Sequence, residues 1–175
     1  MKSKLTIAIC VMASYVSAQY KPIQSASSIE FNVKYIGINT RGTLEGVMGQ
    51  IKWGGSLVDS KFDISVDANS IQTGVELRDK HLRDADFLDV SKYPLIRFVS
   101  SEITASNTSG TFLMRGQLTL KNHSKEISFP FTATSITNGF QFKGSFVINR
   151  QDFEVGKSAV ISDKVEVAVN VSAVN

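Results

Sequence analysis

Apolar and polar residues alternate through most of the chain, and this two-residue period is the feature that most constrains the fold. In residues 29–35, for example, Ile, Phe, Val and Tyr alternate with Glu, Asn and Lys. The period recurs in seven later segments, each with one apolar and one polar face: 47–53, 61–67, 96–98, 112–120, 126–133, 140–148 and 164–173. Such alternation is typical of strands in an antiparallel sheet that has one solvated side.

Turn signals separate these segments. Gly54-Gly55 follows one strand, and Asn138-Gly139, the strongest hairpin signal in the chain, joins 126–133 to 140–148. An open sheet of eight strands would expose two edges, and closure into a barrel removes both. We therefore predict an all-β fold, an eight-stranded antiparallel barrel, with a two-sheet sandwich as the alternative.

Residues 75–89 interrupt the two-residue period. Leu77, His81 and Leu82 share one helical face, and the segment carries many charges. We predict a short helix over 75–83, a second turn to about residue 89, and a return to extended chain at Tyr93-Pro94. The acidic residues of this segment are interpreted as a solvated helix face and not as a metal site, because the calcium-loop spacing is absent.

The first 18 residues have the pattern of a secretory signal peptide. Lys2 and Lys4 precede an apolar run to Val16, and small residues lead to a cleavage site after Ala18. The run is too short for a membrane-spanning helix, which needs ~20 residues. We therefore expect a periplasmic or secreted protein with one domain over residues 19–175. An uncleaved N-terminal anchor is the alternative.

Cleavage would change the composition of the chain. Removal of Lys2 and Lys4 from the 19 basic residues leaves 17 against 16 acidic residues, a net charge of +1. The one Cys is also lost, so disulfides are not expected. A charge this small provides no electrostatic basis for nucleic-acid binding.

The predicted inner faces are rich in Phe and also contain Gly. Nine of the 11 Phe lie in predicted strands, whereas Gly49, Gly116 and Gly144 contribute no side chain to the inner face. An eight-stranded barrel is either filled by its own side chains or holds one small ligand. The periodicity alone leaves a solid core and a ligand cavity both open.

Several motifs together resemble the YceI-like family of lipid- or polyisoprenoid-binding proteins. They are Ile29-x-Phe31-x-Val33-Lys34-Tyr35-x-Gly37, the segment 70–100 with Arg78-Asp79-x-His81-Leu82 and Tyr93-Pro94, Gly116-x-Leu118-Thr119-Leu120, and Asn149-Arg150-x-Asp152-Phe153. The resemblance spans nearly all of residues 19–175. It implies an extended, lipocalin-like antiparallel barrel, export to the periplasm, and a long-chain amphiphile such as an isoprenoid in the lumen.

The resemblance and the inner-face pattern together suggest two sets of ligand-binding residues. The apolar tail is expected along Phe31, Val33, Tyr35, Phe98, Phe112, Met114, Phe129, Phe131, Phe142 and Phe146. Arg78, His81 and Arg150 are the candidates for the polar head. Structural roles remain open for all three: an ion pair or cap for Arg78, packing for His81 and a turn pair for Arg150.

We predict a binding protein, not an enzyme, that holds a polyisoprenoid, a quinone precursor, or a fatty acid or amide for transport or storage. Two His and no Cys in the mature chain supply little for catalysis, and no cofactor or metal is expected beyond the bound lipid. A lumenal enzyme and a small outer-membrane barrel are the alternatives. The expected partners are the ligand and, transiently, a membrane, whereas the oligomeric state, a dimer included, is left open.

Overall fold

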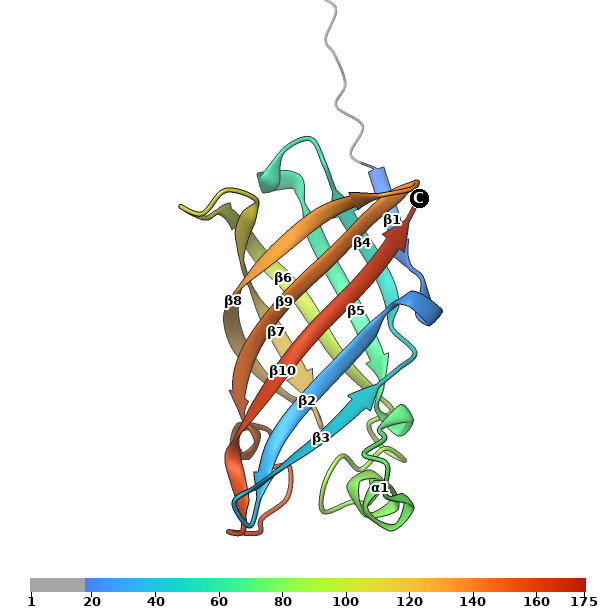
Figure 1. Cartoon of the computed structure of the whole chain (residues 1–175), viewed down its shortest axis with the longest axis vertical. Helices are drawn as coiled ribbons and strands as arrows, with labels where there is room; N and C mark the ends of the chain where they lie inside the picture. Colours follow the sequence, from blue (N-terminus) through green and yellow to red (C-terminus); the bar gives the residue numbers. More distant parts are fainter. Residues whose placement is uncertain (1–17) are drawn as a thin grey trace, which may run out of the picture.

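The described part of the chain is a closed antiparallel barrel. The computed structural model describes residues 18–175. Their strands are β1 (Ala18–Pro22), β2 (Ser28–Tyr35), β3 (Ile38–Leu44), β4 (Met48–Trp53), β5 (Lys61–Asp67), β6 (Leu95–Ala105), β7 (Thr111–Leu120), β8 (His123–Ile136), β9 (Gly139–Asn149) and β10 (Ile161–Val174). They form one sheet in the order β1-β4-β5-β6-β7-β8-β9-β10-β2-β3, and the pairing of β1 with β10 closes it (Figure 1).

The ten strands occupy eight positions in the barrel wall. β1 and β2 both pair with β10 and are separated by the turn η1 (Gln24–Ala26). β4 pairs with β1, and β3 pairs with β2. β1 and β2 therefore form one long interrupted strand of the wall, and β3 and β4 form a second. The predicted eight-stranded antiparallel barrel is therefore confirmed.

The alternation did not predict β1 and β3. β1 is short, and Tyr20 is the one large apolar residue in it. In β3 the more buried positions hold Thr40 and Gly42 before Leu44, so polar and small residues stand where apolar ones were expected. The remaining predicted strands are present, and several extend beyond their predicted ends because pairing with a neighbour orders residues that lack the two-residue pattern.

The predicted helix is present as α1 (Glu76–Arg83), followed by turns that lead to β6. The interpretation of its acidic residues as a solvated face is wrong for two of them. Asp79 is buried and accepts hydrogen bonds from the backbone N–H (2.8 Å) and the hydroxyl of Thr73. Asp89 is buried and accepts a bond from the Ser91 hydroxyl at 3.1 Å. Both carboxylates thus hold the helical segment to adjacent turns.

One end of the barrel is closed by aromatic rings. The Trp53 ring lies 5.1–6.4 Å, centroid to centroid, from the rings of five phenylalanines: Phe62, Phe112, Phe131, Phe140 and Phe142. Tyr20 of β1 packs on Phe140 at 5.3 Å. We call these seven residues the aromatic plug. Edge-to-face contacts of this kind are favourable beyond the area they bury.

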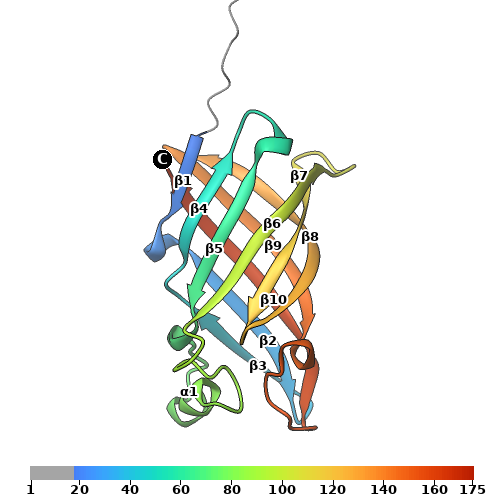
Figure 2. The same ribbon diagram turned by 180° about the vertical axis from the view of Figure 1, so that it is seen from behind.

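The opposite end is surrounded by irregular segments. Figures 1 and 2 show α1, the β2–β3 turn and the loop before β10 together at this end, whereas β1 and the C-terminus lie at the plugged end. Charged side chains face outward on the wall, among them Arg97, Arg115, Lys143 and Glu166. No helix within residues 18–175 has the length and apolar character that a membrane crossing requires. The predicted signal peptide falls almost wholly on residues 1–17, outside the described part of the chain.

Candidate functional site: an apolar cavity in the barrel

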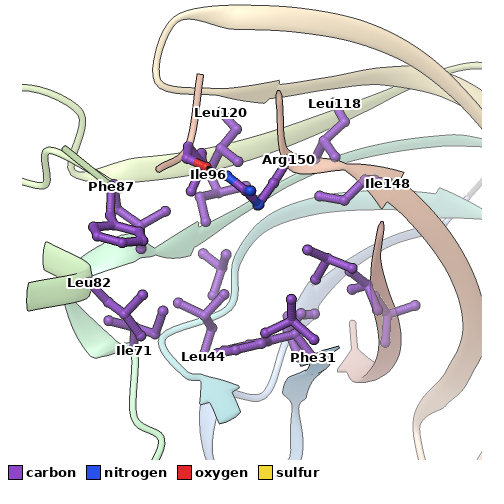
Figure 3. Close-up of a pocket in the computed structure, with 18 of the residues that line it drawn as sticks. Phe31, Leu44, Ile71, Leu82, Phe87, Ile96, Leu118, Leu120, Ile148 and Arg150 are labelled. Atoms are coloured by element: carbon purple, nitrogen blue, oxygen red, sulfur yellow. Dashed lines mark hydrogen bonds between the residues drawn. The ribbon is translucent and has the colours of Figure 1, made fainter. Parts of the chain in front are cut away.

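A cavity of about 960 Å³ occupies the barrel between the aromatic plug and the open end. Its walls are almost entirely aliphatic and aromatic. In Figure 3 the labelled side chains of Phe31, Leu44, Phe87 and Leu120 come from separate parts of the chain and surround one space. Small-molecule sites typically measure roughly 300–1,000 Å³, so this cavity is at the large end of that range.

The structure places nine of the ten predicted tail-binding residues in the cavity wall: Phe31, Val33, Tyr35, Phe98, Met114, Phe129, Phe131, Phe142 and Phe146. Phe112 is the exception. Its ring packs on Trp53 at 5.1 Å and on Phe131 at 5.5 Å, inside the aromatic plug. The inner face of β7 continues past the floor of the cavity, so the alternation alone could not separate wall positions from plug positions.

The glycines of the inner faces do not create the cavity. A Cβ on Gly116 would lie 2.5 Å from Cζ of Phe98, and one on Gly144 would lie 3.0 Å from Cε2 of Phe129. The phenylalanine rings therefore already cover the space that these glycines leave. Gly49, also expected on the inner face, is exposed. The hollow interior comes from the width of the barrel and the medium-sized aliphatic residues along it.

Many wall residues were not among the predicted ligand contacts. Four of them, Val165, Val167, Val169 and Val171, form the inner face of β10, and alternation had already placed them there. Others come from outside the strands, including Ile71, Leu82, Phe87 and Leu88. Helical spacing marked Leu82 as part of an apolar face, but no local signal placed any of these residues in the cavity, because the helical segment is folded against the barrel opening by contacts distant in sequence.

Arg150, the third predicted head-group residue, also lines the cavity, but its donors are bound to the protein itself. Its side chain is buried, and each of its five N–H groups donates to a backbone carbonyl: Nε to Ser162 (3.1 Å), Nη1 to Val155 (2.9 Å) and Gly156, and Nη2 to Ser158 (2.8 Å) and Ile161 (2.9 Å). Asp163 pairs with Nη2 at 3.0 Å. With every donor occupied, Arg150 organises the loop over 155–162 at the open end.

Arg78 lies in the cavity wall and is partly bound. Nε donates to the Thr73 hydroxyl at 2.7 Å and Nη2 donates to the Thr73 carbonyl at 3.0 Å. The neighbouring residue Asp79 forms no ion pair with Arg78 in the described part of the chain and instead accepts hydrogen bonds from the backbone N–H and the hydroxyl of Thr73. Within residues 18–175 Nη1 has no hydrogen-bond partner, so Arg78 retains donors that a polar group in the cavity could use.

His81 and Lys157 line the same cavity and are both exposed. The His81 ring packs edge-to-face on Phe87, with 5.2 Å between the ring centroids. Lys157 forms no hydrogen bond or ion pair with any residue of the described chain, and it was not among the predicted head-group residues. Arg78, His81 and Lys157 thus put polar nitrogen at one end of a largely apolar cavity, where the acidic residue Asp86 also lines the wall.

The described residues contain no cluster of three or more His, Cys, Asp or Glu that could hold a metal ion. Displaced pKa values are found for a pair of exposed side chains on the outer face of the wall. There the Arg97 guanidinium donates two hydrogen bonds to Asp63 (2.9 and 2.7 Å) and lowers the pKa of that carboxyl. The geometry of the cavity suits the holding of an apolar chain with one polar end.

Fold and cavity together place the chain in the class of lipocalin-like antiparallel barrels with an internal apolar cavity. The model of the YceI-like domain family matches residues 20–173, and the chain belongs to that family. A UPF0312 protein of Yersinia enterocolitica is 29% identical over 174 residues, covering 92% of this chain and 88% of that protein. One of Shewanella denitrificans is 31% identical over 104 residues, which are 58% of this chain and about half (54%) of that protein.

Solved structures share the fold at lower identity. Burkholderia cenocepacia BcnA superposes with a TM-score of 0.81 at 21% identity, covering 86% of this chain and 98% of that one. A polyisoprenoid binding domain from Saccharophagus degradans, described as implicated in plant cell wall breakdown, gives 0.71 at 16% identity, covering 88% and 97%. At these identities the structural similarity shows a shared barrel fold and does not show which ligand the barrel binds.

Proposed function

We propose that the protein binds one long-chain amphiphile, with the apolar tail inside the barrel and the polar end at the opening. The observation that supports this most directly is the apolar cavity of about 960 Å³, plugged at one end and open at the other. The description of the Saccharophagus domain as polyisoprenoid binding supports the same class of ligand. A polyisoprenoid, a quinone precursor and a fatty acid or amide all have the required shape.

The physical basis of binding is burial of apolar surface. Removal from water stabilises by ~25 cal/mol per Å², so a tail that contacts the wall along its whole length binds without a strong polar contact. Arg78, through Nη1, and Lys157 are placed to meet an anionic or strongly polar end. His81 lies beside them on α1 and can accept or donate a hydrogen bond.

The alternatives considered from the sequence receive less support. An outer-membrane barrel needs an apolar outer belt, whereas Arg97, Arg115 and Lys143 lie on the outer wall here. A lumenal enzyme would need an acid–base pair inside the cavity, and the surface of the cavity is almost entirely apolar. Transport or storage in the periplasm, or after secretion, is the role consistent with the predicted signal peptide.

A variant that fills the cavity tests the proposal. Val169 lies on the inner face of β10 opposite Gly144, and Val169→Trp would place a large ring across the cavity. We expect retention of a prenyl or fatty chain, measured by native mass spectrometry after uptake from solution, to fall about tenfold or more because less apolar area is buried. Val147→Trp, on the outer face of β9 at 57% exposure, is the matched control and should bind as the wild type does.

The proposal would be contradicted in either of two ways. Wild-type protein that takes up no prenyl or fatty chain lacks the proposed activity. A Val169→Trp protein that is folded by circular dichroism and retains the ligand as well as the wild type binds it outside the barrel.

A further inference from the structure

The open end carries large apolar side chains exposed to solvent. Ile36 and Ile38 of the β2–β3 hairpin are 64% and 72% exposed, Leu77 at the start of α1 is 79% exposed, and Val160 before β10 is 51% exposed. We call these four residues the rim. Single exposed apolar residues are ordinary on a protein surface, but a group of them at one place marks an interaction site.

The rim surrounds the entrance to the cavity. The N–H of Ile36 donates to the carbonyl of Val160 at 2.9 Å, so these two residues lie side by side. Leu77 and Val160 also line the cavity. Figures 1 and 2 both show α1, the β2–β3 turn and the loop before β10 at this end of the barrel. The exposed rim and the apolar interior therefore form one continuous apolar surface.

The backbone at Ile36 gives an independent reason to regard the rim as functional. Ile36 and Gly37 form a two-residue hairpin turn in which both have positive φ, +48° and +77°. Asn-Gly is the preferred pair for such a turn, and a β-branched residue at positive φ is strained. The hairpin at the plugged end has Thr137 and Asn138 between the paired residues Ile136 and Gly139, and its residue at positive φ (+59°) is an Asn, Asn138. At the open end the chain places an exposed Ile where Asn would be more stable, and such strain is characteristic of functional positions.

The charges near the rim are mixed in sign. Lys34, Lys80 and Lys157 are accompanied by Glu76 and Asp86, and all five are exposed. A surface of this kind has no strong preference for an anionic or cationic partner. Its attraction must come from the apolar side chains, and a lipid bilayer accepts such side chains at its interface without needing a complementary shape.

We infer that the rim docks the open end of the barrel onto a lipid bilayer, with the Ile36–Ile38 hairpin and Leu77 inserted at the interface. This inference rests on the proposed function, because a long-chain lipid is at home in a bilayer and is costly to expose to water. Docking joins the apolar interior of the bilayer to the cavity, so the ligand passes between them without crossing water. Tyr35, 47% exposed beside the hairpin, has the apolar ring and polar tip that suit the interface.

Flotation of the empty protein with phosphatidylcholine vesicles tests the inference. The variant Ile36→Asn/Ile38→Thr removes two rim side chains that do not line the cavity, and Asn relieves the strain at position 36. We expect the double variant to fold at least as stably as the wild type and its vesicle partitioning to fall about tenfold or more. Salt should change the partitioning of the wild type little, since the charges near the rim are mixed in sign and nearly balanced.

Two control variants carry matched changes at the other end of the barrel. Val58→Ser removes an apolar side chain that is 93% exposed in the turn η2 (Leu57–Asp59), and it should leave flotation unchanged. Asn138→Ile places an exposed Ile on the hairpin at the plugged end. Any gain in flotation from this substitution should be smaller than the loss caused by the double variant at the rim.

Uptake of a fluorescent fatty acid from solution separates this inference from the proposed function. Uptake that is normal in the double variant, together with lost flotation, supports docking as a step distinct from binding. The inference is overturned if the wild-type protein does not float, if the double variant floats as well as the wild type, or if salt releases the wild-type protein from the vesicles. Rim-dependent self-association in sedimentation without flotation also overturns it, in favour of a second copy. Flotation without any uptake would instead refute the proposed function.

Discussion

At the scale of single residues, Arg150 shows how one buried side chain shapes the open end. Arg150 is 4% exposed, and its guanidinium binds five carbonyls between Val155 and Ser162, a segment that has few backbone partners of its own. A buried charge is tolerated where all of its donors are bound. Through this side chain the loop that carries Lys157 and Val160 is held at the cavity entrance.

Arg150→Met should therefore destabilise the protein strongly. The substitution keeps much of the apolar stem but leaves several carbonyl oxygens unpaired, and we expect a loss of about 3 kcal/mol in the free energy of unfolding. Urea denaturation measures it. Arg115→Met is the control, because Arg115 is half exposed and its one ion pair within residues 18–175, with Glu102, is long at 3.8 Å. Equal stability of the two variants would refute the role assigned to Arg150.

At the scale of elements, the inner faces of paired strands are matched residue by residue. β6 and β7 are neighbours in the wall, and the Phe98 ring of β6 lies over Gly116 of β7. The same arrangement recurs where Phe129 of β8 covers Gly144 of β9. These pairs let the wall carry large rings without displacing the neighbouring backbone.

Gly116→Ala should destabilise the β6–β7 pair. The added methyl group would lie 2.5 Å from both Cζ of Phe98 and the carbonyl oxygen of Val99, so the ring and the strand must shift, at a cost of about 2 kcal/mol. Gly144→Ala should cost less, because its closest contacts are 3.0–3.1 Å. In a double-mutant cycle measured by denaturation, Gly116→Ala should cost less unfolding free energy in the Phe98→Leu background than in the wild type. Additive effects would mean that the ring is not what limits position 116.

On the outer wall, β5 and β6 are joined by the Asp63–Arg97 pair, whose hydrogen bonds lower the pKa of Asp63. A lowered carboxyl pKa adds stability above the pKa of the unfolded chain, and this contribution is lost as the pH falls through the folded-state pKa. Arg97→Met should move the pKa of Asp63 upward in an NMR titration. The stability difference between variant and wild type should be present at neutral pH and vanish in acid; a difference that persists in acid would have another origin.

At the scale of the whole molecule, the barrel is asymmetric along its axis. Trp53 and its aromatic neighbours fill one end, and the interior then opens into a cavity of about 960 Å³ bounded by α1 and the loops. The plug supplies the close packing that holds the closed sheet together, and this allows the other part of the interior to remain hollow. The packed end of the barrel thus contributes most to stability, and the hollow end provides the space for a ligand.

Alternation along the chain determined the fold, the inner face of most strands and the apolar character of the lumen. It could do so because the two faces of a strand are set by neighbours in sequence. The helix at 76–83 was predictable for the same reason, from its local spacing. The weakly alternating β1 and β3 were missed because partners remote in sequence order them.

Only the tertiary structure decided which inward residues pack and which line space. Phe112 and Phe129 are equivalent in the sequence pattern, yet one belongs to the plug and the other to the cavity. Arg150 and Arg78 are both arginines near the opening, yet one is fully bound and the other retains free donors. Such distinctions depend on where the barrel is wide, where it is closed and which carbonyls meet a side chain. These are set by contacts between distant segments, and no local pattern encodes them.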